Sequence, residues 1–391
     1  MEISRRSFLE GGLALGAVVA LGGVGSILPG CSSSSSGTGS TPDASATHVV
    51  VDVMGRKVEV KNDLKSIIAV PWPWTSFVFA VDGSPDKIAS MSATALASYK
   101  GGMFERLAPG LADSKTGFIE DSNKGGGSFG TLNVEELAQL NPDLVIIYKR
   151  DANAMLETLE KAGVTTVVFD FGDLKEVQDG LLLLGECIGG DAVARAKQII
   201  DWHNKAYDLV ISRTKDLKDE EKPSVLLLHN AKPQVYNSDF SNNMFKHSGA
   251  TIPWEDEVTS AGNGTVDFEQ IAQWDPDYIL LGNFSDHTPE MIYNNEMAGR
   301  DWSQLKAVRN KHVYKLPQGI YRWDPPSTEA HLRLYWEAKL FHPELFTDIN
   351  LEEETREFYS VLFGHSLTED DFNLIYHNAM NANSEPVKLN A

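Results

Sequence analysis

Aromatic, cationic and polar side chains follow the predicted buried strands of this chain, at positions where a ligand could be held. Apolar runs that begin after Ser66, Asp143 and Ser224 predict three of these strands, and two more end near Gly282 and Pro317. In open parallel sheets, ligands bind beyond the carboxyl ends of the strands. We therefore expect a binding cleft lined by Trp72, Trp74, Tyr148, Arg150, His229, Asn230, Tyr236, Asn283, Tyr321, Arg322 and Trp323.

These residue types favour an anionic ligand. Aromatic faces offer a large apolar area, and an arginine fork grips carboxylates and other anionic oxygens. An anionic metal chelate, such as a ferric siderophore or haem with its propionates, would suit this cleft. A bare oxyanion such as molybdate is the alternative, held by Arg150, Arg322 and backbone N–H groups. Trp72 and Trp323 could instead simply pack the faces of the two lobes predicted below.

A bare metal ion is less well supported as the ligand. A tight zinc or manganese site needs several histidines and carboxylates that converge on one point. Among the residues expected at the cleft, His229 is the one histidine. The sequence therefore leaves the metal-binding residues unassigned.

Short apolar runs that alternate with helical patterns predict an α/β fold with parallel sheets. An internal repeat divides this fold into two halves. NVEELAQLNPDLVIIYK, which begins at Asn133, is echoed by DFEQIAQWDPDYILLGN, which begins at Asp267, at an offset of 134 residues. The equivalent residues include Glu135 with Glu269 and Asp143 with Asp277. We therefore expect two Rossmann-like lobes of similar construction.

One long amphipathic helix is predicted between the two copies of the repeat. Residues 191–217 contain no glycine or proline and would span about 40 Å as a helix, long enough to join two lobes. A β-hairpin is expected around Met54 and Gly55, near the start of the first lobe. The expected organisation is a first lobe over 48–190, the joining helix over 191–217, a second lobe over 218–347 and a helical extension over 348–391, which we expect to pack on the second lobe.

The first residues of the chain predict export. Ser4, Arg5, Arg6 and Phe8 precede an uncharged run, which is typical of a twin-arginine signal over 1–30. Cys31 closes this run in the order Leu-Pro-Gly-Cys, which predicts a lipid-modified cysteine even though proline is unusual at its position. Residues 31–47 are rich in serine, glycine and threonine and predict a flexible tether. Cys187, the second cysteine, is expected to be a buried and inert thiol.

The charge of the chain excludes some partners. The 391 residues carry a formal net charge of -21, and the isoelectric point is about 4.8. Binding to nucleic acid requires clustered lysine and arginine, so this class of partner is not expected. Because the expected cleft is aromatic and basic, the acidic residues should lie on the outer surface.

Together, these motifs resemble the class III solute-binding proteins, which deliver iron complexes, haem and cobalamin to ABC importers. The resemblance rests on the hairpin motif VDVMGRKV, the two copies of the repeat, AVRNKHVYKLP, and the segment that begins at Trp323. It implies two lobes joined by a single long helix, a ligand cleft between the lobes, and a monomer that meets an ABC permease and its ATPase. Permease docking in this family implies a carboxylate on each lobe, here Glu135 and Glu269.

The resemblance does not name the ligand. Some relatives with a similar Trp-x-x-Pro-Ser-x-Glu segment take oxyanions, so molybdate, tungstate and cobalamin stay open beside a ferric siderophore. An adhesin or sensory module on the same fold is the alternative from another class. Catalysis is not expected: Gly126, Ser128 and Gly130 fit the spacing of a nucleophile elbow, but polar residues precede them where that motif needs a buried strand. No resident cofactor is expected.

Overall fold

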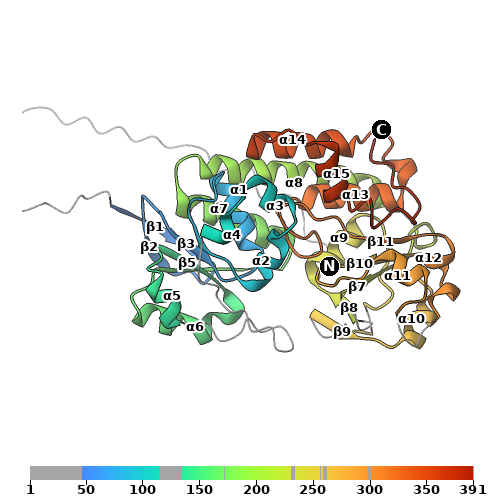
Figure 1. Ribbon diagram of the computed structural model, residues 1–391, viewed down its shortest axis with the longest axis horizontal. Helices are drawn as coiled ribbons and strands as arrows, with labels where there is room; N and C mark the ends of the chain where they lie inside the picture. The colour runs from blue at the N-terminus through green and yellow to red at the C-terminus, as the bar shows by residue number, and fades with distance from the viewer. Residues whose placement is uncertain are drawn as a thin grey trace, which may run out of the picture. The chain divides into compact units, whose positions relative to one another are not determined.

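The computed structural model describes residues 46–114, 134–170, 172–229, 234–255, 257–258, 262–297 and 301–390 (Figure 1). A four-stranded and a five-stranded sheet with helices against them, beside a two-stranded hairpin, confirm the predicted α/β fold. We call the elements from β1 to α7 the N-lobe, and those from β7 to α13 the C-lobe.

The N-lobe begins with the predicted hairpin. Strands β1 (Thr47–Val51) and β2 (Lys57–Lys61) pair in antiparallel fashion. Asp52 holds the turn, because its Oδ1 accepts the backbone N–H groups of Met54 and Arg56, both at 3.0 Å. The Arg56 guanidinium also pairs with the Asp52 carboxylate at 2.7 Å, and Gly55 adopts a positive φ of 76°. The VDVMGRKV motif is thus a turn motif.

A four-stranded parallel sheet forms the centre of the N-lobe, in the order β4-β3-β5-β6. Its helices include α1 and α7, which pack against each other and against the joining helix. The strands are β3 (Ile67–Ala69), β4 (Ile88–Ser90), β5 (Leu144–Tyr148) and β6 (Thr166–Phe169). The helices are α1 (Trp74–Asp82), α2 (Ala93–Tyr99), α3 (Met103–Leu107), α4 (Leu111–Ser114), α5 (Val134–Gln139), α6 (Lys149–Lys161) and α7 (Leu174–Ile188).

The C-lobe sheet differs from the prediction, because it is mixed. Its order is β11-β10-β7-β8-β9, and β10 runs parallel to both β7 (Val225–Leu228) and β11 (Val313–Lys315). Strands β8 (Gln234–Asn237) and β9 (Gly262–Thr265) are antiparallel. The predicted parallel arrangement holds for β7, β10 and β11, and the antiparallel strands β8 and β9 extend it. Only residues 229–233 connect β7 to β8, and a parallel crossover needs a dozen residues or more.

The remaining C-lobe elements complete this half of the molecule. They are α9 (Asp239–His247), α10 (Phe268–Trp274), β10 (Tyr278–Leu281), α11 (Pro289–Tyr293), α12 (Lys306–Arg309) and α13 (Ala330–Phe341). Three short 3-10 helices lie at Asp219–Glu221, Trp302–Gln304 and Pro343–Leu345. Every residue of α13 is buried, which places this helix in the core rather than on the surface.

The two copies of the repeat have the same local structure. Asp143 precedes β5, and its Oδ2 accepts the Lys65 N–H at 2.8 Å. Asp277 precedes β10, and its Oδ2 accepts the Ser224 N–H at 2.9 Å. Two residues earlier in each copy, Asn141 and Asp275 adopt left-handed φ angles of 45° and 40°. Each aspartate thus ties the start of its strand to the start of the parallel neighbour, which confirms the repeat.

The long helix is α8, which spans Ala192–Thr214 and confirms the predicted helix to within three residues at either end. It packs against α1 and α7 of the N-lobe and against α9 and α13 of the C-lobe (Figure 1). His203 lies on its buried face, where Nε2 is 2.9 Å from the Thr328 carbonyl oxygen. This histidine is part of the core.

The C-terminal extension contains α14 (Leu351–Phe363) and α15 (Glu369–Ile375). We expected it to pack on the second lobe, but it also contacts the first. The Phe363 ring stacks on Phe79 of α1 with 4.8 Å between centroids, and Asp371 forms an ion pair with Arg106 of α3. The extension therefore connects both lobes, a role that its sequence did not suggest.

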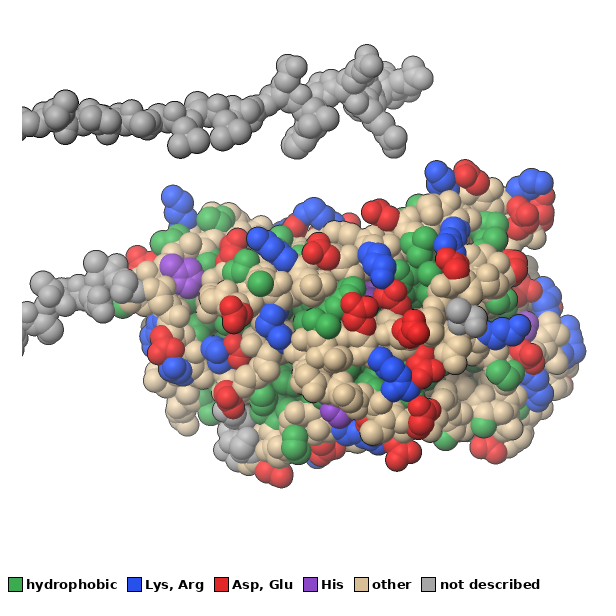
Figure 2. Space-filling model, turned by 90° about the horizontal axis from the view of Figure 1, so that it is seen from above, with side chains coloured by type: hydrophobic (Ala, Val, Ile, Leu, Met, Phe, Trp, Pro, Cys, Tyr) green, Lys and Arg blue, Asp and Glu red, His purple; other side chains and the backbone are tan. Residues whose placement is uncertain are grey.

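Charged side chains are spread over the molecular surface. Acidic and basic residues intermix on the face seen in Figure 2. Cys187 is buried, and burial raises the pKa of its thiol to about 12, which fits an inert cysteine. Among the described residues, no helix combines the length and apolar character needed to cross a bilayer.

Candidate functional site

The candidate site lies where strand ends of the two lobes meet. Trp72 follows β3 in the N-lobe, and Phe284 follows β10 in the C-lobe. Their rings touch edge to face, with 5.3 Å between centroids. His229, at the end of β7, also contacts Phe284, with 4.6 Å between centroids. Of the aromatic side chains expected at the cleft, Trp72 lies at this contact, where it meets Phe284.

Arg322 joins the two lobes beside this aromatic contact. Its Nε donates to the Asn283 carbonyl oxygen at 3.0 Å, and its Nη1 donates to the carbonyl oxygen of Thr94 in the N-lobe at 3.4 Å. The guanidinium carbon lies 4.2 Å from the centre of the Phe284 ring. Nη2 has no hydrogen-bond partner among the described residues. A cation held in this way could bind an anionic ligand with that remaining amino group.

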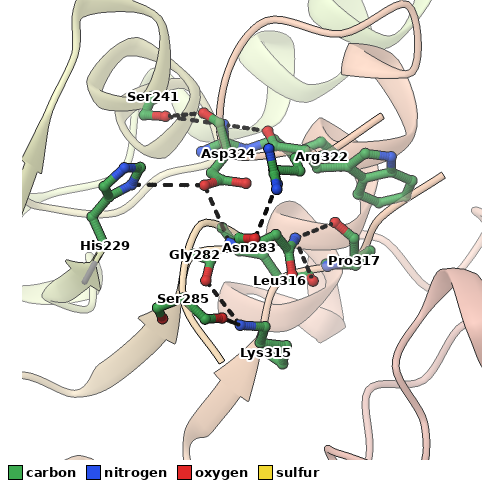
Figure 3. Close-up of polar contacts among 12 residues, drawn as sticks. His229, Ser241, Gly282, Asn283, Ser285, Lys315, Leu316, Pro317, Arg322 and Asp324 are labelled. Atoms are coloured by element: carbon green, nitrogen blue, oxygen red, sulfur yellow. Dashed lines mark hydrogen bonds and ion pairs between the residues drawn. The ribbon is translucent and has the colours of Figure 1, made fainter. Parts of the chain in front are cut away.

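A buried carboxylate lies two residues after Arg322 in the chain (Figure 3). The Oδ2 atom of Asp324 accepts the Asn283 N–H at 3.2 Å and lies 3.8 Å from Nδ1 of His229. Asp324 is fully buried, and its Oδ1 has no hydrogen-bond partner within the described part of the chain. Burial lowers the pKa of His229 to about 4, although Asp324 opposes this shift. His229 is therefore neutral at pH 7.

Lys315, in β11, fixes the loop that carries Asn283 and Phe284 (Figure 3). Its Nζ donates to the carbonyl oxygens of Gly282 at 2.9 Å, Ser285 at 2.6 Å and His287 at 3.2 Å. These three bonds use all the protons of the ammonium group. Burial lowers the pKa of Lys315 to about 8. Lys315 therefore supports the loop and has no proton left for a ligand.

The amide of Asn283 completes this network. Its Nδ2 donates to the carbonyl oxygens of Leu316 and Pro317, both at 3.0 Å. Asn283 was expected at the cleft, and its side chain turns out to support the loop from within. Sequence reasoning missed Thr94, Lys315 and Asp324. A charged residue inside the apolar run of β11 was a usable signal for Lys315, whereas Thr94 acts through its backbone and gives no signal.

Two of the expected cleft residues belong to the core. Trp74 is fully buried at the start of α1, where its ring packs against Phe77 at 4.5 Å and Phe169 at 4.6 Å between centroids. Trp323 is also fully buried and meets the ring of Tyr376 in the extension at 5.8 Å. Both side chains are 0% exposed, so neither presents the open surface to a ligand that the sequence predicted.

Two of the tyrosines expected at the cleft are buried, and each has an arginine guanidinium over its ring. Tyr148 is buried at the end of β5, with the Arg150 guanidinium 5.7 Å from its ring centre, and Tyr321 is buried 5.7 Å beneath Arg322. Arg150 itself is exposed and lies 3.4 Å from Asp151. Asn230 and the side chain of Tyr236 lie outside the described residues, as does the Gly126-to-Gly130 motif.

The described residues contain no group of three or more histidine, cysteine or acidic side chains that could hold a metal ion. The polar groups that converge are instead a guanidinium, a carboxylate and a neutral imidazole. This donor set offers hydrogen bonds and one positive charge to a ligand rather than a coordination shell.

Comparison with known proteins places this geometry in a family. Residues 78–319 match the family model described as periplasmic binding protein, and residues 2–22 match the signal sequence of the twin-arginine translocation pathway. A solved periplasmic solute-binding protein from Veillonella parvula is 33% identical, covers 86% of this chain and 98% of its own, and superposes with a TM-score of 0.77.

Curated relatives bind different ligands. The molybdate-binding protein MolA of Haemophilus influenzae is 20% identical over 84% of this chain and 94% of its own length. The iron(3+)-hydroxamate-binding protein FhuD of Bacillus subtilis is 27% identical over 57% of this chain and 69% of its own. The match over more than half of its length shows that the chain belongs to the periplasmic binding protein family, whose members are substrate-binding proteins of ABC transporters.

Proposed function

We propose that this protein captures an anionic metal compound between its lobes and delivers it to an ABC permease. The observation that carries this proposal is Arg322, a residue that is 7% exposed and whose guanidinium contacts both lobes with one amino group still available. A buried cation at a lobe contact can attract an anion strongly, because surrounding protein screens the charge less than water does. Closure around the anion would engage the two lobes together.

A compact oxyanion of the molybdate class fits the geometry best. Trp72 touches Phe284, and Arg322 reaches Thr94, so the strand ends of the two lobes already meet at two points. Contacts this close between the lobes favour a small ligand over a large chelate. The likeness to MolA, which extends over most of both chains, supports the same substrate class.

A ferric siderophore or haem-like chelate, which the sequence favoured, is the second candidate. The aromatic rings of Trp72 and Phe284 would offer such a ligand an apolar wall. The likeness to FhuD supports this reading over about half of the chain. Cobalamin is the third candidate ligand within the same family. An adhesin or sensory module without a transporter is the alternative function from another class.

Isothermal titration of the protein without its export signal would test the proposal. The titrants would be sodium molybdate, sodium tungstate, ferrioxamine, haem and cobalamin. We expect micromolar or tighter binding of an oxyanion, and about a 100-fold loss of affinity in Arg322→Gln, because a charge-assisted contact in a buried site is lost. Arg150→Gln is the matched control, since that arginine is exposed and pairs with its neighbour Asp151.

The outcomes of this titration distinguish between the candidate ligands and between the candidate functions. Binding of ferrioxamine or haem alone would replace the oxyanion by a chelate as substrate, and this binding should then weaken in Trp72→Ala. Equal affinity of the wild type and Arg322→Gln for the bound titrant would overturn the assignment of Arg322. No binding of any titrant would favour the sensory or adhesive alternative.

Delivery would use one acidic residue on each lobe. Glu269 is exposed in the first turn of α10, and Glu135 is its equivalent in α5, although its side chain lies outside the described residues. We expect the double charge reversal Glu135→Lys and Glu269→Lys to abolish uptake by cells and to leave ligand affinity unchanged. Uptake of the identified ligand and titration of the purified variant would measure the two effects. A loss of affinity would contradict this docking role.

The twin-arginine signal indicates export, and we propose that Cys31 then anchors the protein to the outer face of the membrane. The serine-rich tether that follows would leave the lobes free to meet the permease. Metabolic labelling with a fatty-acid analogue should mark the wild type and not Cys31→Ala. Labelling of both, or of neither, would rule out this attachment site.

A further inference from the structure

The segment Gln318–Asp324, which we call the arginine loop, carries Arg322 and is held from behind by the C-terminal extension. The backbone N–H of Gln318 donates to the carbonyl oxygen of Ile375 in α15 at 2.8 Å. The N–H of Ile320 donates to Oε2 of Glu329 at 3.0 Å. The other oxygen of this carboxylate, Oε1, accepts the hydroxyl of Tyr359 in α14 at 2.6 Å. The loop thus has two attachments that depend on the extension.

The Glu329 carboxylate fits tightly against the loop. A Cβ at Gly319 would lie 1.7 Å from Glu329 Oε1, so this close approach requires glycine at position 319. Glu329 and Tyr359 are both fully buried. Burial raises the pKa of Glu329 to about 7, although the hydrogen bonds from Tyr359 and Ile320 oppose the shift. A displacement of this carboxylate would be transmitted directly to the backbone of the loop.

Tyr359 is itself held in place by the opposite lobe. The last turns of α14 carry Phe363, which stacks on Phe79 of the N-lobe, and Leu362, whose carbonyl oxygen accepts a hydrogen bond from Arg195 of α8. Arg195 also donates to the carbonyl oxygen of Ala80 in α1. The chain of contacts therefore runs from α1 through α14 and Tyr359 to Glu329 and the arginine loop.

We propose that Tyr359 is a positioning residue for ligand binding, which acts through Glu329 to hold Arg322 at the contact between the lobes. Helix α14 then supports the binding site through Tyr359 rather than forming a surface addition. This inference rests on the proposed function, because it assigns the extension a role at the same site.

The test compares two conservative substitutions in the extension. Tyr359→Phe removes the hydroxyl that reaches Glu329 and keeps the ring. Tyr376→Phe is the matched control, because its equally buried hydroxyl lies 2.7 Å from that of Thr355 and is not hydrogen-bonded to the loop. We expect molybdate to bind about tenfold more weakly to Tyr359→Phe and nearly unchanged to Tyr376→Phe. If the wild type binds ferrioxamine and not molybdate, ferrioxamine is the probe for these variants.

A double-mutant cycle separates positioning from a general structural effect. If Tyr359 acts through Arg322, the tenfold loss should disappear when Tyr359→Phe is added to Arg322→Gln. Glu329→Gln should weaken binding in the same way as Tyr359→Phe. A loss that persists in the Arg322→Gln background, or one of equal size in Tyr376→Phe, would overturn the inference.

A measurement without ligand keeps this inference distinguishable from the proposed function. Amide hydrogen exchange at Ile320 should be at least tenfold faster in Tyr359→Phe than in the wild type, because the acceptor of that N–H loses its support. If the wild type binds none of the probes, the proposed function fails, and faster exchange still supports the control of the loop by Tyr359. Unchanged exchange at Ile320 would overturn it.

Discussion

The two lobes share their construction at the amino ends of their strands and differ at the carboxyl ends. Asp143 and Asp277 make the same backbone contact in the two copies of the repeat. Beyond the strands, the N-lobe contributes the Trp72 ring and the Thr94 carbonyl oxygen to the site, whereas the C-lobe contributes a buried ionisable network. The aspartate contacts at the amino ends of the strands are the same in both lobes, whereas the ionisable side chains at the candidate site belong to the C-lobe.

Backbone contacts hold the C-lobe network in place. Lys315, Asp324 and Glu329 each bind backbone groups of the loops that present Phe284 and Arg322. The N-lobe contributes the Trp72 ring, which contacts Phe284. We expect the C-lobe to offer a preorganised half-site that faces this apolar ring.

The largest effect on stability is expected at Trp74, one of two tryptophans that lie two residues apart in the N-lobe. Trp74→Ala should lower the free energy of unfolding by about 3 to 5 kcal/mol, because a fully buried ring is removed from the core. Ligand affinity should stay unchanged. Chemical denaturation and titration would measure the two quantities.

Trp72→Ala is the matched variant and should give the reverse pattern. Its ring is only partly buried, so the loss of stability should be smaller, and affinity should fall because the contact with Phe284 is lost. If both variants changed affinity by the same factor, the division between a core tryptophan and a site tryptophan would be wrong.

Acid should destabilise the C-lobe before the N-lobe. His48 is the one histidine between residues 48 and 190, whereas in the C-lobe burial lowers the pKa values of His247 and His287, and that of His229 to about 4. An unfolded histidine titrates near pH 6.5, so between about pH 6.5 and 4 the unfolded chain binds more protons than the native protein. The free energy of unfolding should therefore fall as the pH drops, by up to about 3 kcal/mol for His229 alone.

Denaturation between pH 7 and 4 would measure this loss, and hydrogen exchange would locate it. The variant His229→Gln should reduce the slope of stability against pH over this range. Exchange that accelerated first in the N-lobe sheet would contradict the assignment of the acid sensitivity to the C-lobe.

Sequence reasoning succeeded where a local pattern decides the structure. The hairpin around Met54 and Gly55, the internal repeat and helix α8 follow from short-range spacing and periodicity. The carboxyl ends of the strands were also located correctly, which brought Trp72, His229, Asn283 and Arg322 to one region. Membership of the family followed from the same motifs.

What sequence reasoning could not predict depends on direction and on distant contacts. Trp72 and Trp74 are two residues apart, yet one ring meets the other lobe and one enters the core, because the start of α1 lies between them. Asp324 and Glu329 become important through loops and helices far away in the chain. Contacts of the extension with both lobes likewise depend on where α14 ends against α1, which periodicity does not reveal.

The duplicated aspartates give the smallest expected effect and the most direct test of the comparison. In each lobe, an aspartate carboxylate accepts a backbone N–H shortly before a neighbouring strand and pairs with a lysine. Asp143→Ala removes the carboxylate that pairs with Lys61, and Asp277→Ala removes the one that pairs with Lys306. Each should lower the free energy of unfolding by about 1 to 2 kcal/mol, measured by urea denaturation, because one charge-assisted hydrogen bond to the backbone is lost in each lobe. Ligand affinity should not change in either variant, since both residues lie at the ends of their strands opposite to the site. If the two losses of unfolding free energy differed by more than about 1 kcal/mol, the two aspartates would not stabilise their lobes equally. The C-lobe would then differ from the N-lobe in its scaffold as well as in its site.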